Sequence, residues 1–423
     1  MRIELRICVC FGSRKGALMA ELTVRIGGDD IALLRRVLGA HGAGAGPAAP
    51  HRVVVDAHLA PRKAEIVQLA QVAGIPMLID PQTYYLQDYQ HPGDSWAALP
   101  YAEAAIATPA DLLNPTRVDQ VVATCVEFQL QHGASAILAP YVHIESATDG
   151  WLQVQLALWA ATHRYLAAQQ IHVPVIAVVA MGWRLLHRPT WPAVIEPLAT
   201  GVEALGVQEI ALAASKVDQG AHPAQRLADY LATMHRLARI APVTAWQQGV
   251  LGDVSVAGGA AGYETGIGRR ERCDLRVAMT NRRTAPDPNA PRGPRGVFIR
   301  QLNRSVPKRT VVAISTDRRL MARVICPDPG CCPMGRESLL GDARTHALIS
   351  RKTSLLQQQR ISRPSWGWNR LAAHADEALD LAARLAATRQ RNPAITRIDI
   401  GALMATKAVA DHHRQALRHR KAA

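Results

Sequence analysis

Aromatic side chains are scarce in this chain, because Phe, Trp and Tyr make up only 4% of its 423 residues. Hydrophobic residues nevertheless account for 48% of the sequence, so we expect a sizeable core built mainly from Ala, Val, Leu and Ile. No run of about 18 apolar residues is present, and the sequence predicts no membrane-spanning helix. The opening stretch MRIELRICVCFGSRKG lacks the pattern of a secretion signal, so we expect a cytoplasmic protein that does not bind a membrane.

Acidic residues are too few to balance the basic ones, since 34 Asp and Glu stand against 49 Lys and Arg. The formal charge is +15 and the isoelectric point is about 10.0. This surplus favours a nucleic acid, a phosphate group or an acidic surface as partner, but it does not bear on the fold. Basic residues are densest between positions 269 and 323, which suits the phosphates of tRNA or DNA. The alternative is a solvated basic face without a ligand.

A dinucleotide-binding fingerprint is also missing, because no GxGxxG follows the first clear strand pattern. Apolar runs instead alternate with helical patterns, which is typical of a parallel sheet buried on both faces. We expect strands at residues 52–56, 75–80, 136–140, 173–181, 208–214, 242–246 and 253–257, with an eighth from 274–279 or 296–299. This rhythm predicts a (β/α)8 TIM-type barrel, and a doubly wound open sheet is the alternative.

The composition changes along the chain and divides it into four expected parts. They are an N-terminal extension (1–50), the barrel (51–310), a Cys/His module (311–352) and a helical, basic C-terminal tail (353–423). The sequence leaves the oligomeric state open, a homodimer included.

Cysteines are few and odd in number, seven in all, which argues against a framework of disulfides. Three of them, Cys326, Cys331 and Cys332, fall within seven positions, and His346 follows in a helical stretch. Three thiolates and one imidazole suit a tetrahedral, structural Zn²⁺ site. Because adjacent cysteines rarely ligate together with good geometry, one of Cys331 and Cys332 could be left over. A reduced buried cluster and a vicinal disulfide are the alternatives.

Polar residues follow several of the expected strands, where a barrel places its active site. Asp80 and Glu264 come just past clean strand patterns, and we expect them to act as catalytic carboxylates. Gly258 and Gly259 open a glycine-rich loop that would let a backbone approach a ligand closely, unless it is a connection of no chemical consequence. The residues expected to bind substrate are Gln82, Tyr141, His143, Gln247, Gln248, Gly258, Gly259, Tyr263, Arg269 and Arg282.

The barrel pattern, the late cysteine cluster and the basic C-terminal half together resemble the tRNA-guanine transglycosylase family, including its DNA-acting relatives. The segment LIDPQTYYLQ resembles the family's strand-end aspartate segment, and CDLRVAMTNRR resembles its nucleophile segment. The resemblance implies Asp274 as nucleophile and Asp80 as the group that handles protons. It also implies a structural zinc site, tRNA or DNA as partner, and a purine or 7-deazaguanine base as substrate.

The first functional hypothesis is therefore a transglycosylase-like transferase, which exchanges or cleaves a guanine-type base through a carboxylate nucleophile. A different barrel enzyme, a hydrolase or lyase of a small phosphorylated or acidic substrate, is the second. The third is a barrel that binds nucleic acid without catalysis.

Overall fold

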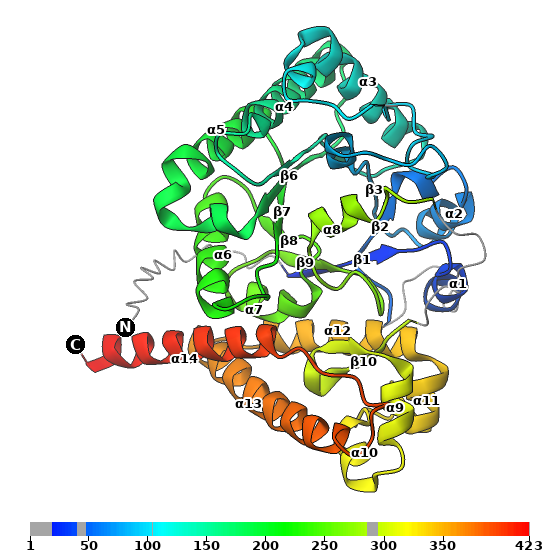
Figure 1. Cartoon of the computed structure of the whole chain (residues 1–423), viewed down its shortest axis with the longest axis vertical. Coiled ribbons are helices and arrows are strands. Elements are labelled where there is room, and N and C mark those ends of the chain that lie inside the picture. The colour runs from blue at the N-terminus through cyan, green and yellow to red at the C-terminus, as the bar shows by residue number, and fades with distance from the viewer. Residues whose placement is uncertain (1–18, 40–47, 104, 286–294, 423) are drawn as a thin grey trace.

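The computed structural model describes residues 19–39, 48–103, 105–285 and 295–422. Its main sheet is parallel throughout and runs in the order β3-β2-β1-β9-β8-β7-β6-β4, with β5 also paired to β6. The strands are β1 (Glu21–Ile26), β2 (Arg52–Asp56), β3 (Met77–Asp80), β4 (Ile137–Leu138), β5 (His143–Ile144), β6 (Val175–Gly182), β7 (Glu209–Ser215), β8 (Val243–Ala245) and β9 (Gly262–Thr265). Figure 1 shows these strands at the centre of the upper body.

The sheet curls into a nearly closed ring. β4 and β5 act as one interrupted strand, so the ring has eight strand positions. Its two ends meet where the Ser135 amide donates to the Met77 carbonyl, with N and O 2.8 Å apart. The predicted (β/α)8 barrel is thereby confirmed.

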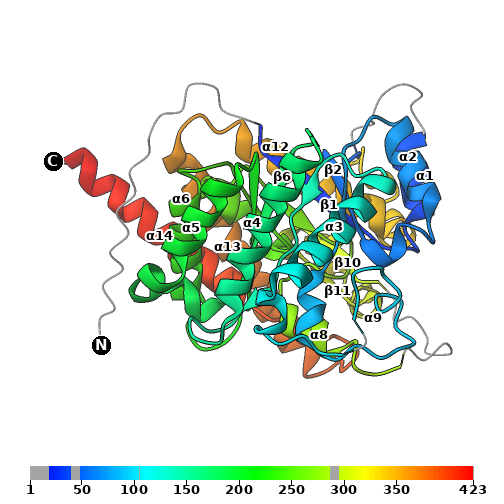
Figure 2. The same cartoon turned by 90° about the horizontal axis from the view of Figure 1, so that it is seen from above.

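Helices cover the outside of the ring, as Figures 1 and 2 show. They are α1 (Ile31–Gly39), α2 (Ala64–Val72), α3 (Pro115–Gln131), α4 (Trp151–Ala168), α5 (Ile195–Leu205), α6 (Pro223–Leu237) and α7 (Gly252–Ala257), and α8 (Leu275–Thr280) follows the last strand. The strands between them are buried apolar runs, for example Val175–Gly182 with every residue buried. Short 3-10 turns η1 to η7 lie at Ala57–Leu59, Thr83–Gln87, Asp111–Leu113, Trp183–Leu186, Arg188–Ala193, Gly249–Leu251 and Arg300–Leu302.

The ring begins earlier than expected. Strand β1 pairs with both β2 and β9, so the first barrel strand lies inside the segment 1–50 that was expected to be an extension. The expected eighth strands are wrong, because 275–280 forms helix α8 and 297–299 belongs to a separate sheet.

The glycine-rich stretch after residue 252 also differs from expectation. Residues 253–257 lie in helix α7 rather than in a strand, and the last barrel strand is Gly262–Thr265. Gly262 is required there, because a Cβ atom at this position would overlap the carbonyl oxygen of Glu21 on β1. The close approach of two barrel strands therefore explains a glycine that resembles a loop residue in the sequence.

The rest of the described chain forms a C-terminal module with its own apolar core. A two-stranded antiparallel sheet, β10 (Val297–Ile299) and β11 (Arg304–Val306), opens it. The helices are α9 (Lys308–Ile314), α10 (Arg318–Val324), α11 (Arg336–Gly341), α12 (Ala343–Gln359), α13 (Pro364–Arg389) and α14 (Gly401–Ala422). Helix α12 contacts α7, β1 and α1, and α14 contacts α6, so the module packs directly on the barrel.

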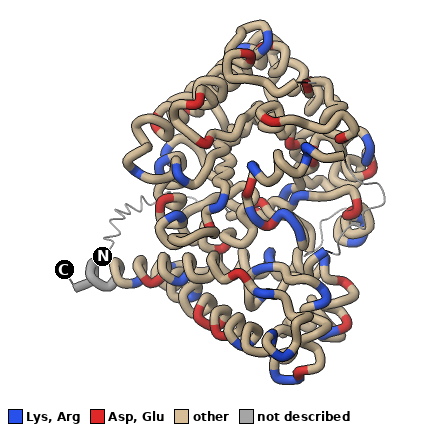
Figure 3. Tube along the Cα trace, viewed as in Figure 1, with Lys and Arg blue, Asp and Glu red and all other residues tan. Residues whose placement is uncertain are grey.

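Charge is spread unevenly over this architecture. In the view of Figure 3, Lys and Arg positions gather at the centre of the barrel and recur across the C-terminal module, with acidic positions interspersed. Across the described ranges, no helix combines the length and the apolar character that crossing a membrane requires.

Candidate active site

A buried arginine lies among three carboxylates at the carboxyl ends of adjacent barrel strands. Arg25 of β1 reaches Asp56 of β2 at 2.6 Å, Asp80 of β3 at 2.8 Å and Glu264 of β9 at 3.0 Å. All four side chains are at most 2% exposed. Strands β1, β2, β3 and β9 are neighbours in the ring, so their ends bring together residues that are far apart in the sequence.

The electrostatics of this group, which we call the Arg25 cluster, are set by burial and by pairing. Burial alone would raise the pKa of Asp56, but the opposing attraction of Arg270 and Arg25 holds it well below its ordinary value. For Glu264 burial is the larger effect and raises the pKa, although Arg25 acts against it. The two carboxylates therefore have pKa values pushed in opposite directions by their surroundings, which is common at functional sites.

Several residues expected to bind substrate surround the Arg25 cluster. The Tyr141 hydroxyl donates to Asp80 Oδ1 at 2.8 Å, and the Gln82 side-chain amide donates to Asp56 Oδ1 at 3.2 Å. The backbone N–H of Gln247 donates to Glu264 Oε2 at 2.8 Å. The structure thus brings the ends of six strands, β1, β2, β3, β4, β8 and β9, to one polar centre.

A cavity of about 170 Å³ opens beside the Arg25 cluster, between the loops that follow β1, β2 and β9. We call it the mouth cavity. Its polar lining comes from four arginines, Arg25, Arg269, Arg270 and Arg295, with His58 and two acids, Asp29 and Asp56. Arg270 spans the cavity wall, because its guanidinium pairs with buried Asp56 while half of its side chain remains exposed. Gly266 makes the turn compact, since a Cβ atom there would overlap the carbonyl oxygen of Arg269.

A second polar group, the His143 relay, lies at the ends of β5 and β7. The Ser215 hydroxyl is 3.2 Å from His143 Nε2, and His143 Nδ1 is 3.6 Å from a Glu145 carboxylate oxygen. Burial lowers the pKa of His143 to about 4, so the imidazole is neutral at pH 7. Burial raises the pKa of Glu145, whose side chain is 29% exposed. Glu145 is therefore the best-placed group of this relay to exchange a proton with a substrate.

Asp274 lies apart from the Arg25 cluster. Its side chain caps α8 by accepting from the Val277 amide at 3.2 Å, and it pairs with Lys216 Nζ at 3.5 Å. The charges of Lys216 and Asp274 both shift the pKa of Glu145, so Asp274 lies close to the His143 relay. Of the three carboxylates expected to be catalytic, the structure joins Asp80 and Glu264 through Arg25 and places Asp274 elsewhere.

Other expected binding residues lie away from the strand ends. Gly258 and Gly259 follow α7 and precede β9, which places them at the opposite end of that strand from the mouth cavity. The Tyr263 ring packs against Gly252 of α7, outside the ring of strands and away from the Arg25 cluster. The Gln248 amide is used within the fold, since it donates to the Ala214 carbonyl at 2.6 Å.

The remaining predicted residues lie at the rim of the barrel. Arg269 lines the mouth cavity. Arg282 pairs with Asp94 and lies over the Tyr85 ring, 4.5 Å from its centroid, so it fastens a loop. The sequence did contain a signal for the missed residue Arg25, because a lone charge inside the apolar run LTVRI must find buried partners.

The C-terminal module gathers the four predicted metal ligands. The ligand atoms of Cys326, Cys331, Cys332 and His346 lie within 4.8 Å of one another. His346 Nδ1 is 3.3 Å from both the Cys331 and the Cys332 sulfur. Its Nε2 is 3.0 Å from the Phe298 carbonyl oxygen, which orients the ring with Nδ1 toward the thiols. The group could hold a metal ion, and both adjacent cysteines take part in it.

The chain thus has the fold of (β/α)8 barrel enzymes, with its polar groups at the expected face. Its sequence matches no protein-family model and no curated protein. It is similar to a thiamine phosphate pyrophosphorylase from Pyrococcus furiosus (12% identity, TM-score 0.28, covering 63% of this chain and 95% of that one). It is also similar to a proposed deoxyribose-phosphate aldolase from Toxoplasma gondii ME49 (10% identity, TM-score 0.27, covering 64% and 94%). These scores carry no argument about chemistry, so the fold rests on the strand order and pairing.

Proposed function

We propose that this protein is a barrel enzyme acting on a small phosphorylated or acidic substrate, whose anionic group binds in the mouth cavity. The observation that carries the proposal is the set of arginines at this cavity, between the loops that follow the first and the last barrel strands. Barrel enzymes frequently bind phosphate in the loops after their seventh and eighth strands. The guanidinium group is well suited to phosphate and carboxylate because it donates in a planar fork.

The Arg25 cluster supports this role in two ways. It fixes Asp56, which in turn orients the Arg270 guanidinium toward the cavity. It also keeps the buried carboxylates paired, so the cavity is not left with a bare negative charge. The His143 relay supplies Glu145 as the candidate for proton transfer, as a hydrolase or lyase requires.

Binding of ribose 5-phosphate, with ribose as the uncharged comparison, tests this proposal by titration calorimetry. We expect the phosphorylated sugar to bind and Arg270→Ala to weaken binding about tenfold, the value of one charge-assisted hydrogen bond. Arg239→Ala is the matched control, because Arg239 is exposed beyond the C-terminal end of α6, on the face opposite the mouth. Equal affinity for ribose and ribose 5-phosphate, or full affinity in Arg270→Ala, contradicts the proposal.

A second candidate function is base exchange in tRNA or DNA by a transglycosylase-like mechanism. The Cys/His group in the C-terminal module favours it, because the resemblance implies a structural metal there. In this case Asp274 would attack the sugar and Asp80 would handle protons, although Asp80 is paired with Arg25 and Tyr141. The test is exchange of labelled guanine, and intact exchange in both Asp274→Ala and Asp80→Ala rejects the candidate.

We further propose that the Cys/His group binds Zn²⁺ as a structural metal. Three thiolates and one imidazole are the donor set of many closed zinc sites. Cys326, Cys331, Cys332 and His346 would hold the ion and fasten the segment before α11 to helix α12. The hydrogen bond from His346 to the Phe298 carbonyl links this group to β10.

A further inference from the structure

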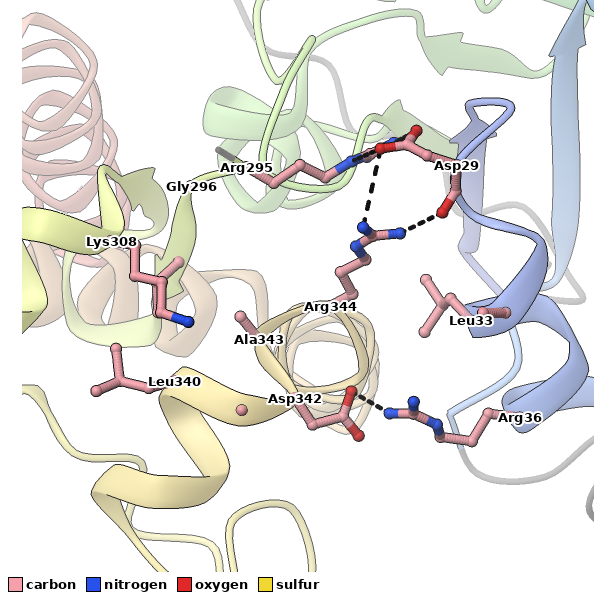
Figure 4. Close-up of a pocket in the computed structure, with 13 residues that line it drawn as sticks. Asp29, Leu33, Arg36, Arg295, Gly296, Lys308, Leu340, Asp342, Ala343 and Arg344 are labelled. Carbon is pink, nitrogen blue, oxygen red and sulfur yellow. Dashed lines mark hydrogen bonds and ion pairs between the residues drawn. The ribbon is translucent and has the colours of Figure 1, made fainter. Parts of the chain in front are cut away.

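A larger cavity, of about 440 Å³, lies between the barrel and the C-terminal module. We call it the junction cavity. The turn after β1 and helix α1 form its barrel side, and the start of β10, the start of α9 and the α11–α12 connection form its other side. Figure 4 shows side chains from both sides directed into this space. Ligand sites occur preferentially at such boundaries, and this volume lies within the usual range for small molecules.

The polar lining of the junction cavity is mainly basic. Four cations, Arg36, Arg295, Lys308 and Arg344, face two acids, Asp29 and Asp342. Most of these charges are already paired: Arg36 with Asp342, and Arg295 and Arg344 with Asp29 and Asp30.

Lys308 differs from the other cations of this cavity. Within the part of the chain that the structure describes, no carboxylate lies within ion-pair distance of Lys308, which is the first residue of helix α9. Figure 4 shows its amino group pointing across the cavity toward Ala343. Lys308 is an exposed residue that lines the cavity, and a cation next to satisfied ion pairs is available to an incoming anion.

The rest of the lining is apolar. Leu33 of α1, Val297 of β10 and Leu340 of α11 contribute side chains from three elements. A ligand that fits must therefore present an apolar face as well as an anionic group. Inorganic phosphate has the charge but not the apolar face, whereas a nucleoside monophosphate has both.

We propose that the junction cavity is a second binding site, separate from the mouth cavity, for a small organic phosphate of nucleotide size. Its phosphate binds Lys308, and its apolar body packs on the apolar lining residues Leu33 and Leu340. Arg295 and Asp29 line both cavities, so the two sites share a wall. The proposal does not depend on what the mouth cavity binds.

Titration calorimetry of the full chain with AMP as the probe, at low ionic strength, tests this site. We expect binding with a dissociation constant that rises about five- to tenfold in Lys308→Ala. Arg309→Ala is the matched control, because Arg309 is the next residue, is exposed and does not line the cavity. The affinity of this variant for AMP should stay within about twofold of the wild type.

The mouth variant Arg270→Ala separates this proposal from the proposed function. In Arg270→Ala we expect the affinity for AMP at the junction cavity, the site that Lys308→Ala weakens, to be unchanged. Absence of AMP binding, equal effects of Lys308→Ala and Arg309→Ala, or a loss of AMP affinity confined to Arg270→Ala would each overturn the junction site. The last result would still support an anion site at the mouth.

Discussion

Arg25 places a buried positive charge inside a barrel whose strands are otherwise mainly apolar. Three carboxylates surround it within 3.0 Å. A buried cluster of this kind need not be more stable than an apolar core, but removing one partner leaves uncompensated charge behind. The cluster therefore fixes the geometry of four strand ends, and a variant that removes one of its partners should lose stability.

Replacing Arg25 tests whether this one side chain compensates the charge of the three buried carboxylates. Arg25→Ala should lower the free energy of unfolding by about 3–5 kcal/mol, because three buried carboxylates lose their shared partner. Arg25→Lys retains the charge but not the planar fork of donors, so its free energy of unfolding should lie between those of Arg25→Ala and the wild type. Urea unfolding measures both, and a loss below about 1 kcal/mol in Arg25→Ala would show that the cluster is not held as described.

His143 gives the protein a stability that depends on pH. Burial lowers its pKa to about 4 from an ordinary value of 6.5, so between these values the unfolded chain binds a proton that the folded chain does not. Stability should therefore fall as the pH drops through this window and stay level above it. His143 should contribute up to about 2 kcal/mol to the fall between pH 7.5 and pH 5.

The comparison uses urea unfolding of His143→Gln at both pH values. The variant should lose less stability than the wild type on acidification, while His163→Gln, which changes an exposed histidine on α4, should behave like the wild type. Because His58 is also buried with a pKa lowered to about 4, part of the pH dependence should remain in His143→Gln. An unchanged pH dependence in that variant is incompatible with a neutral buried imidazole.

At the scale of elements, the Cys/His group joins the segment before α11 to helix α12. Purified protein should contain about one equivalent of zinc. Removal of zinc by a chelator should increase amide exchange from residue 325 to 350, because binding of a structural metal is coupled to folding of the segment that holds it.

Cysteine variants give the matched test of the proposed zinc site in the Cys/His group. Cys326→Ser should retain much less zinc, since it removes one of four donors. Cys125→Ala should retain it fully, because Cys125 is buried in α3 of the barrel. Equal zinc content in the two variants would show that Cys326 does not bind the metal.

Strands such as Val175–Gly182 and Glu209–Ser215 are predictable because both of their faces are buried and their residues are apolar. β1 and β9 are hard to predict for the opposite reason. Each directs a charged side chain into the barrel, Arg25 and Glu264, and β9 also needs Gly262 where it approaches β1. Two of the four strands that build the Arg25 cluster, β2 and β3, are apolar runs that the sequence makes clear, whereas β1 and β9 depart from that pattern.

At the scale of the whole molecule, the barrel and the C-terminal module share helix α12. Buried Arg351 on this helix pairs with Glu271 at 2.9 Å and donates to the Gly249 carbonyl at 2.8 Å, both next to β9. It also lies over the Phe298 ring of β10, 4.4 Å from the centroid. One side chain thus connects the loops around the last barrel strand to the module.

This connection predicts that barrel and module unfold together. Arg351→Ala should lower the free energy of unfolding by about 3–5 kcal/mol, because Glu271 then stays buried without its partner. Tryptophan fluorescence, to which barrel residues and Trp366 and Trp368 of α13 both contribute, and far-ultraviolet circular dichroism should each show one transition in the wild type, and the two should coincide. Separate transitions in the wild type would mean that the two parts are independent domains.

The site is less predictable than the fold because it depends on three-dimensional neighbours. Asp80 and Glu264 can be chosen from their places at strand ends, but their common partner Arg25 precedes the first strand that the sequence makes obvious. Gly258 and Gly259 mislead for a related reason. Their role depends on which end of β9 they adjoin, and that end is known only once residues 253–257 are seen to be helical.

The proposed function requires an anion bound between the loops that follow β1, β2 and β9. A crystal of the protein soaked in tungstate, a heavy mimic of phosphate, would locate that anion by anomalous scattering. We predict a peak in the mouth cavity within hydrogen-bond distance of the Arg270 guanidinium. Peaks elsewhere, with none in the mouth cavity, would contradict the assignment of this cavity as the anion-binding part of the active site.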